Sequence, residues 1–135
     1  MIIGKKFHFD AAHYLPGHPT CGKMHGHTWH VDVELEGPLD SQEMVFDFGS
    51  LKEIMDQILK TFDHCCLNDF IKYPTCEMIT TLIGTSLTTR LECTELSWLN
   101  NIGLYSVKVQ EGDGGYAIFE AKCSRDLSQR VLKTV

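Results

Sequence analysis

The sequence predicts an α+β domain in which two strands, two helices and two further strands follow one another along the chain. Hydrophobic and polar residues alternate near both ends, while hydrophobic residues recur at helical spacing in the middle. The segments with these patterns are, in order, residues 2–13, 25–36, 50–62, 75–91, 103–111 and 115–123. Strands grouped around a helical pair predict a four-stranded antiparallel sheet with both helices packed on one face.

The first two strands carry histidines at one end of their apolar faces. The apolar face of the first strand ends at His13, and that of the second begins at His25 and His27. Because the side chains of a strand point alternately to its two faces, these three imidazoles belong to the core side of the sheet. The same alternation leaves His8 and His30 on the wet face. Strand alternation therefore places three of the seven histidines together at the core side of the sheet.

Three imidazoles at one end of a sheet predict a zinc site. Three nitrogen ligands with one open position are typical of catalytic zinc, although other divalent metals accept the same ligands. Cys21 lies four residues before His25 and leaves three readings open. It could be a fourth ligand that closes the site, a base or nucleophile beside the metal and Lys23, or an uninvolved loop residue.

The helical pair brings a second group of candidates. Asp47 or Ser50 can cap the first helix, and Thr75 can cap the second. The first helix is followed at once by Asp63 and His64. A carboxylate beside an imidazole can fix its tautomer, as in a catalytic triad, but the histidine can equally be a favourable cation at a helix end.

The last two strands are predicted to form a hairpin, because Asp113 and Gly114 separate two alternating runs. Glu111 ends the first of these strands on its apolar face. A carboxylate there needs a partner, either a hydrogen-bond donor in the core or a ligand with a pair of N–H groups. Glu77, in the first turn of the second helix, is most simply an acid at a helix N-terminus.

Length and composition bound the function. The 135 residues are predicted to form one domain, residues 1–123, followed by a polar C-terminal tail, residues 124–135. A net charge of −6 argues against nucleic-acid binding. The sequence has no run of about 18 apolar residues and no signal peptide, so neither a membrane span nor secretion is expected. Its six cysteines are scattered, which favours a reducing cytoplasm.

Five segments together resemble the 6-pyruvoyltetrahydropterin synthase / 6-carboxytetrahydropterin synthase family, and they occur in the family's order. The segments are Phe9–His13, Cys21–His27, Asp63–Asn68, Pro74–Glu77 and Val109–Glu111. The resemblance implies a tunnelling fold (T-fold), in which ββααββ subunits join their sheets into a barrel. It also implies a homohexamer, a dimer of trimers, with active sites at subunit interfaces. Pairing between subunits would remove the two open edges of a four-stranded sheet.

The resemblance further implies roles for the candidates. The implied zinc ligands are His13, His25 and His27. The implied catalytic residues are Cys21, Asp63, His64 and Glu111. The cysteine matches the family's proton acceptor and the Asp-His pair its charge relay. The glutamate matches both the relay and the acid that grips the 2-amino and N3 edge of the pterin. Second-rank candidates for substrate contacts are Thr75 and Glu77.

The family's substrate is 7,8-dihydroneopterin triphosphate. Three residues separate Cys21 from His25, and this short spacing resembles the 6-carboxytetrahydropterin synthase branch. That branch implies a lyase that releases acetaldehyde and triphosphate and leaves 6-carboxy-5,6,7,8-tetrahydropterin, on the path to queuosine and other deazapurines. The sequence departs from the family at Gly112, where a threonine is common.

Other functions stay open beside this branch. A 6-pyruvoyltetrahydropterin synthase would eliminate triphosphate from the same substrate without cleaving a carbon–carbon bond. A non-catalytic, zinc-stabilised oligomer would bind pterins or purines without turnover. A zinc hydrolase is less favoured, because it would want a carboxylate base beside the metal, where this motif supplies Cys21.

Overall fold

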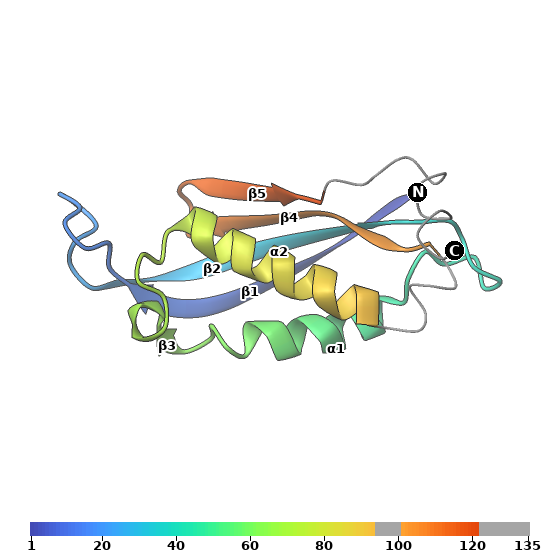
Figure 1. The fold of residues 1–135 in the computed structure, drawn as a ribbon, viewed down its shortest axis with the longest axis horizontal. Helices are drawn as coiled ribbons and strands as arrows, with labels where there is room; N and C mark the ends of the chain where they lie inside the picture. Colours follow the sequence, from blue (N-terminus) through green and yellow to red (C-terminus); the bar gives the residue numbers. More distant parts are fainter. Residues whose placement is uncertain (94–100, 122–135) are drawn as a thin grey trace, which may run out of the picture.

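The computed structural model describes residues 1–93 and 101–121. Within these ranges the elements, drawn in Figure 1, are β1 (Ile2–His13), β2 (His25–Glu36), α1 (Phe48–Leu59), β3 (Cys65–Cys66), the 3-10 helix η1 (Leu67–Asp69), α2 (Cys76–Cys93), β4 (Gly103–Glu111) and β5 (Tyr116–Glu120). Both helices lie on one face of the sheet, with α2 against β4 and β5, and α1 against α2 and β1 (Figure 1). The predicted α+β class is confirmed.

The sheet of the described residues has five strands where four were predicted, in the order β3-β1-β2-β4-β5. β1 and β2 are antiparallel over their whole length, up to the pairing of His13 with His25. The additional strand, β3, is two residues long and pairs in parallel with Ala11 and Ala12 of β1. A strand of two residues carries no hydrophobic periodicity, which is why the sequence did not indicate it.

The bounds predicted for β1, β2 and β4 are confirmed, whereas both helices shift by a few residues. α1 begins at Phe48 because the Asp47 carboxylate accepts the Ser50 backbone N–H at 2.7 Å. It ends at Leu59 rather than at residue 62. Phe62 is nevertheless buried, in the turn that leads to β3. The helical spacing therefore predicted correctly that Phe62 is buried, but it placed the end of the helix three residues too late.

α2 is capped by the predicted residue, since the Thr75 hydroxyl accepts the backbone N–H of Met78 at 3.2 Å. Its interior contains Gly84, which costs about 1 kcal/mol of helix propensity relative to alanine. Packing accounts for this glycine. A Cβ at this position would come within 2.4 Å of the Phe119 ring of β5. The missing side chain therefore allows α2 to lie close against the sheet.

The hydrophobic core fills the space between the sheet and the helices and extends up to the selected histidines. Trp29 is fully buried in it and stacks on Phe9, with ring centroids 5.9 Å apart. The same indole meets the rings of His13 and His27 edge-on, at 5.0 and 5.6 Å. The packed core thus supports the histidine end of the sheet.

No helix in the described part of the chain is long and apolar enough to cross a membrane. β5 ends at Glu120, short of the predicted residue 123. The predicted C-terminal tail, residues 124–135, and most of the loop of residues 92–102 lie outside the described residues.

Candidate metal centre and active site

The three selected histidines converge at one end of the sheet. His13, the last residue of β1, is paired with His25, the first residue of β2, and His27 follows on the same face. The ring centroids lie 4.6 Å apart for His13 and His25, 4.8 Å for His25 and His27, and 5.3 Å for His13 and His27. With Glu111, they bring four possible ligand atoms within 4.8 Å of one another. Strand pairing is therefore sufficient to assemble the cluster.

Backbone carbonyls orient two of the imidazoles. His13 Nδ1 lies 2.8 Å from the Pro74 carbonyl oxygen, and His25 Nδ1 lies 2.7 Å from that of Lys23. Because a carbonyl can only accept, each Nδ1 must carry the proton that it donates. In the neutral imidazole, Nε2 is then the nitrogen whose lone pair can bind a metal. This is the outer hydrogen bonding that metal-binding histidines use to fix their tautomer.

His27 provides the test of whether these residues fit a metal. Its Nε2 atom is buried and makes no hydrogen bond; Glu111 Oε1 lies 2.7 Å away but is not aligned for one. Burial, as the largest cause, lowers the pKa of His27 and favours its neutral form. A buried nitrogen without a hydrogen-bond partner needs an explanation, and a bound cation is one. The three Nε2 atoms thus fit zinc or a similar divalent metal.

Glu111 takes the fourth place in the cluster. Its Oε1 atom lies 3.0 Å from His13 Nε2, 2.7 Å from His27 Nε2 and 3.9 Å from His25 Nε2. The carboxylate on the apolar face of β4 therefore has imidazoles as its partners. It can serve as a fourth metal ligand. Alternatively, it can accept N–H groups of a bound molecule when a metal engages the imidazoles.

The β4–β5 hairpin explains the departure from the family at Gly112. This residue has a φ of +55°, in the left-handed region that favours glycine. Its N–H donates to the Thr28 carbonyl at 3.0 Å, and a Cβ here would lie 3.6 Å from His27 Nδ1. Glu111 is held in the same turn by a hydrogen bond from its N–H to the Gly115 carbonyl at 2.9 Å. The glycine thus fits the turn that positions the carboxylate.

Cys21 does not belong to the cluster of ligand atoms. It lies in the loop between β1 and β2, where its carbonyl accepts the Leu15 N–H at 2.7 Å. Its own N–H donates to His18 Nδ1 at 3.0 Å, and the Thr20 hydroxyl lies 3.7 Å from its sulfur. A Cβ on Gly22 would come within 2.6 Å of the His18 carbonyl oxygen, so the glycine is needed for this turn.

Sequence reasoning assigned no role to His18, although its ring accepts backbone N–H groups of the cysteine loop. Besides the bond from Cys21, the ring nitrogen lies 3.3 Å from the Thr20 backbone nitrogen. Both contacts require an unprotonated Nδ1. The position of the histidine three residues before the cysteine was the available signal, but only the folded loop reveals the contact.

Asp63 and His64 form a close pair, as the sequence suggested. Asp63 Oδ2 lies 2.8 Å from His64 Nδ1. The hydrogen bond to Asp63 is the largest cause that raises the pKa of His64. In turn, the pKa of Asp63 is lowered, first by the backbone N–H of Asp10 and then by the bond to His64. The pair therefore favours a charged imidazolium and a charged carboxylate.

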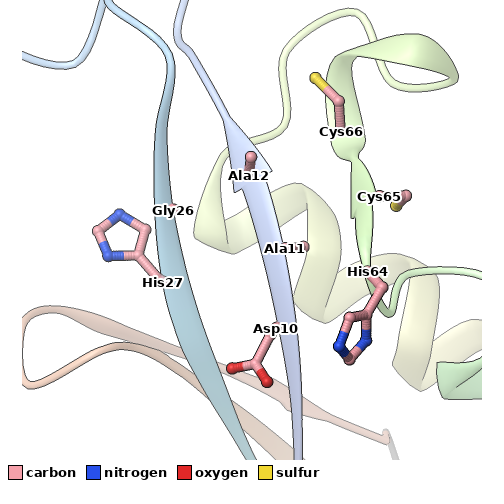
Figure 2. A pocket seen from close by; sticks show the side chains of 8 residues that line it. All are labelled: Asp10, Ala11, Ala12, Gly26, His27, His64, Cys65 and Cys66. Atoms are coloured by element: carbon pink, nitrogen blue, oxygen red, sulfur yellow. The ribbon is translucent and has the colours of Figure 1, made fainter.

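The structure does not bring this pair to the metal cluster of the same chain. In the β1–β3 register Ala11 lies opposite Cys65, so His64 continues that register opposite Asp10, on the wet face of the sheet. The His64 side chain is 78% exposed. In Figure 2, β1 runs between His64 and His27. A shallow hollow on this side is lined by Asp10, Ala11, Ala12, Gly26, His27, His64, Cys65 and Cys66 (Figure 2).

The two second-rank substrate candidates lie at the start of α2. Thr75 uses its hydroxyl to cap the helix, and Glu77 is an exposed acid in the first turn. Their substrate contacts stay a prediction. Pro74, just before them, has the more direct connection to the centre through its carbonyl bond to His13.

A protein-family model described as 6-pyruvoyl tetrahydropterin synthase matches residues 2–122. The chain belongs to this family. The predicted resemblance is therefore confirmed, and so is the expectation that the chain is an enzyme of the tetrahydropterin synthase type. The region matched includes every candidate residue named above.

Curated relatives of this family member differ in how much of each chain aligns. A protein of Archaeoglobus fulgidus, provisionally named 6-carboxy-5,6,7,8-tetrahydropterin synthase, is 48% identical over 79 residues, which cover 58% of this chain and 69% of the relative. The 6-carboxy-5,6,7,8-tetrahydropterin synthase of Haemophilus influenzae is 42% identical over 73 residues, which cover 50% of this chain and 52% of the relative. The match thus spans only about half of the second relative.

A solved structure extends the likeness to nearly the whole fold. The structure of Caenorhabditis elegans 6-pyruvoyl tetrahydropterin synthase aligns with a TM-score of 0.76 over 90% of this chain and 96% of that chain, at 23% identity. At this identity the likeness speaks for the fold alone. The predicted T-fold is confirmed.

Proposed function

We propose that this chain is a zinc-dependent lyase that converts 7,8-dihydroneopterin triphosphate and one water molecule to 6-carboxy-5,6,7,8-tetrahydropterin, acetaldehyde and triphosphate. The observation that carries the proposal is the convergence of three imidazoles beside a carboxylate, with one imidazole nitrogen buried and without a hydrogen bond. The names of the A. fulgidus and H. influenzae relatives support the carboxy product. The short spacing between Cys21 and His25 supports it as well.

In this proposal His13, His25 and His27 hold the metal. When bound, zinc supplies Lewis-acid polarisation of the substrate's side-chain hydroxyls. The chain contributes the orientation of the ligands: the carbonyls of Pro74 and Lys23 bind the Nδ1 atoms of two imidazoles and so leave each Nε2 as the nitrogen that can bind the metal. The core beneath them, with Trp29 against two of the imidazoles, limits their movement.

Glu111 is proposed to hold the pterin ring. A carboxylate can accept two parallel N–H bonds from the 2-amino and N3 edge of a pterin. Its side chain is 24% exposed and lies against the histidines, so a pterin bound to it would lie next to the metal ligands. If Glu111 instead closed the site as a fourth ligand, it could not also hold the pterin ring. In the non-catalytic alternative, Cys21 is the fourth zinc ligand.

Cys21 is proposed as the base that takes a proton from the substrate side chain. Its place outside the cluster of ligand atoms supports this role over that of a fourth ligand. His64, oriented by Asp63, would pass protons to and from the same reacting carbons. Such proton transfers are needed both to eliminate triphosphate and to break the carbon–carbon bond that yields acetaldehyde.

The position of His64 calls for a second copy of the chain in this proposal. Because the sheet separates His64 from the cluster of its own chain, a neighbouring subunit would supply it. Two edges of the described sheet are available for pairing: β1 meets β3 only at residues 11 and 12, and β5 meets only β4. Pairing β5 of one copy with β1 of the next would cover both edges and close the barrel of one trimer, two of which make up the expected homohexamer.

A turnover assay tests the proposal. The purified, zinc-loaded protein is incubated with 7,8-dihydroneopterin triphosphate, and pterins and acetaldehyde are identified by mass spectrometry. We expect 6-carboxy-5,6,7,8-tetrahydropterin and acetaldehyde in equal amounts. The matched control is Cys21→Ala, which should form neither product while retaining zinc.

The other outcomes identify the alternatives. 6-Pyruvoyltetrahydropterin without acetaldehyde would assign the chain to the pyruvoyl branch and leave the site assignments standing. Bound zinc and bound pterin without any product would favour the non-catalytic oligomer.

A further inference from the structure

We propose that Asp10 of β1 is a positioning residue for the Asp63–His64 pair, and that Thr28 of β2 holds the Asp10 carboxylate in place. The inference rests on the proposed function, in which His64 transfers protons. It adds two residues from neighbouring strands that neither the sequence patterns nor the proposed roles had included. Asp10 acts here through His64 and does not itself touch the substrate.

The main chain of Asp10 connects to both members of the pair. Its N–H donates to Asp63 Oδ1 at 3.0 Å, and its carbonyl accepts the His64 N–H at 2.6 Å. The second of these bonds joins main chain to main chain and extends the β1–β3 pairing by one residue beyond Ala11 and Cys65. Asp63 thus has one carboxylate oxygen on the backbone of β1 and the other on the imidazole.

His64 has a φ of +56°, in the left-handed region that non-glycine residues rarely adopt. Such a conformation persists only where the surrounding structure holds it. The carbonyl of Asp10 provides that hold through the His64 N–H. This backbone conformation places the imidazole on the solvent-exposed face of the sheet, beside Asp10. The next residue, Cys65, is again part of β3 and pairs with Ala11.

The side chain of Asp10 lies close to the same imidazole. Its carboxylate, a carboxylate oxygen of Asp63 and a ring nitrogen of His64 lie within 4.8 Å of one another. Thr28, directly opposite Asp10 in the β1–β2 register, donates its hydroxyl to Asp10 Oδ1 at 2.6 Å. The imidazole therefore has two carboxylates beside it, and each is itself held by a hydrogen bond from another element.

Two charged groups act on the His64 imidazole. Asp63, through its hydrogen bond and then its charge, raises the pKa of His64 most, and the charge of Asp10 raises it further. Other titratable groups line the two adjoining surfaces. In the hollow that His64 lines they are His27, Cys65 and Cys66, and in the groove that Asp63 lines they are Lys5, Lys6, His8, Lys52, Asp56 and Lys60. These groups are solvent-exposed or partly so, and screening limits the effect of those that make no direct contact.

The consequence for catalysis is a histidine with a defined tautomer and direction. Asp63 engages Nδ1, which leaves Nε2 of His64 as the atom that exchanges protons. Asp10 prevents Asp63 from turning away, because it holds the second oxygen of that carboxylate. In the shared site proposed above, the free Nε2 would face the metal cluster of the neighbouring copy.

The test compares Asp10→Asn and Thr28→Val with the unchanged full-length, zinc-loaded protein. Asn keeps the main-chain bonds and the side-chain shape but removes the charge. Asp32→Asn is the matched control, since it removes a carboxylate from the same wet face, four residues along β2 from Thr28. Histidine C2 hydrogen exchange, followed by mass spectrometry, measures the pKa of His64 in each protein, and kcat is measured against pH with 7,8-dihydroneopterin triphosphate.

We expect Asp10→Asn to lower the pKa of His64, to move the matching limb of the kcat profile in the same direction, and to lower kcat by roughly 3- to 30-fold with unchanged zinc content. This loss is smaller than the 10²–10⁴-fold effect of removing a general acid or base. Thr28→Val should act in the same direction but less. Asp32→Asn should leave both the pKa and kcat unchanged.

Two results separate this inference from the proposed function. If the pKa of His64 falls in Asp10→Asn but kcat is unchanged in His64→Ala, the positioning of His64 stands and its catalytic role fails. If the pKa of His64 in Asp10→Asn equals that of the unchanged protein, the inference about Asp10 is overturned, whatever the turnover.

Discussion

His13 and His25 lie directly opposite each other at the shared end of β1 and β2, with ring centroids 4.6 Å apart and each Nδ1 bonded to a backbone carbonyl. Neither residue could leave this arrangement without unpairing the strands. His27, on the same face of β2, completes the cluster.

Removal of a metal ligand should abolish stable zinc binding. In His27→Ala the buried Nε2 is gone and only two of the three histidine nitrogens remain. We expect zinc affinity to fall by more than the roughly 10- to 100-fold that follows the loss of an outer hydrogen-bond partner. Competition with a chromogenic chelator measures this. His30→Ala, on the wet face of the same strand, is the control and should bind zinc normally.

Cys21→Ala should show whether Cys21 acts as a catalytic base or as a zinc ligand. Because the cysteine lies outside the cluster, we expect zinc content to stay at the original level while kcat falls by about 10²- to 10⁴-fold. Metal analysis and the turnover assay are run on the same sample, with Cys93→Ala as an exposed-cysteine control. Loss of zinc together with activity would make Cys21 a ligand and contradict the base assignment.

His18 should matter for turnover through the conformation of the cysteine loop. His18→Ala removes the acceptor of the Cys21 N–H, and a lost hydrogen bond of this kind is worth up to about tenfold in kcat. His18→Asn places an amide oxygen near the position of Nδ1 and should recover most of the activity. Zinc content should be unchanged in both. Equal activity of the two variants would show that the ring nitrogen is not the feature that counts.

The Asp63–His64 pair should make stability depend on pH in a defined direction. The pKa of His64 is raised above the ordinary histidine value of 6.5. Its contribution to stability is therefore complete below pH 6.5 and is lost as the pH rises through the folded-state pKa. The pKa of Asp63 is lowered below 3.8, so its contribution is complete above that pH and is lost on acidification. Asp63→Asn should therefore reduce Tm most between pH 3.8 and 6.5, and less at alkaline pH.

Thermal melts across this range check the pH expectation. Asp69→Asn, which changes an acid in the following 3-10 helix, is a suitable control. A Tm difference that does not change with pH would mean that the two charges do not stabilise each other.

Gly84→Ala should destabilise the protein even though alanine is the better helix former. The added Cβ would lie 2.4 Å from the Phe119 ring, and overpacking of this kind costs about 1–3 kcal/mol. Chemical denaturation measures the change in the free energy of unfolding. In the background of Phe119→Leu, which clears the ring, the same substitution should cost less, and an equal cost in both backgrounds would exclude the contact as the cause.

The sequence alone determined the strands that carry the candidate metal centre and the residues that form it. Alternation is a local property, so the parity of His13, His25 and His27 could be read without knowing the fold. The same argument put Glu111 on that face and left His8 on the other. The family resemblance rested on five short segments, and the match of the family model over residues 2–122 confirms it.

Only the tertiary structure decided which residues from distant parts of the sequence are in contact. Strand pairing put Glu111 of β4 against histidines that come from β1 and β2, and the positive φ of His64 placed its imidazole on the opposite face, beside Asp10. Neither the two-residue β3 nor the hydrogen bond from Cys21 to His18 has a periodic signature. The reason is physical: periodicity reports which face a residue occupies, while partners distant in sequence depend on strand register and loop conformation, which form only when the whole domain packs.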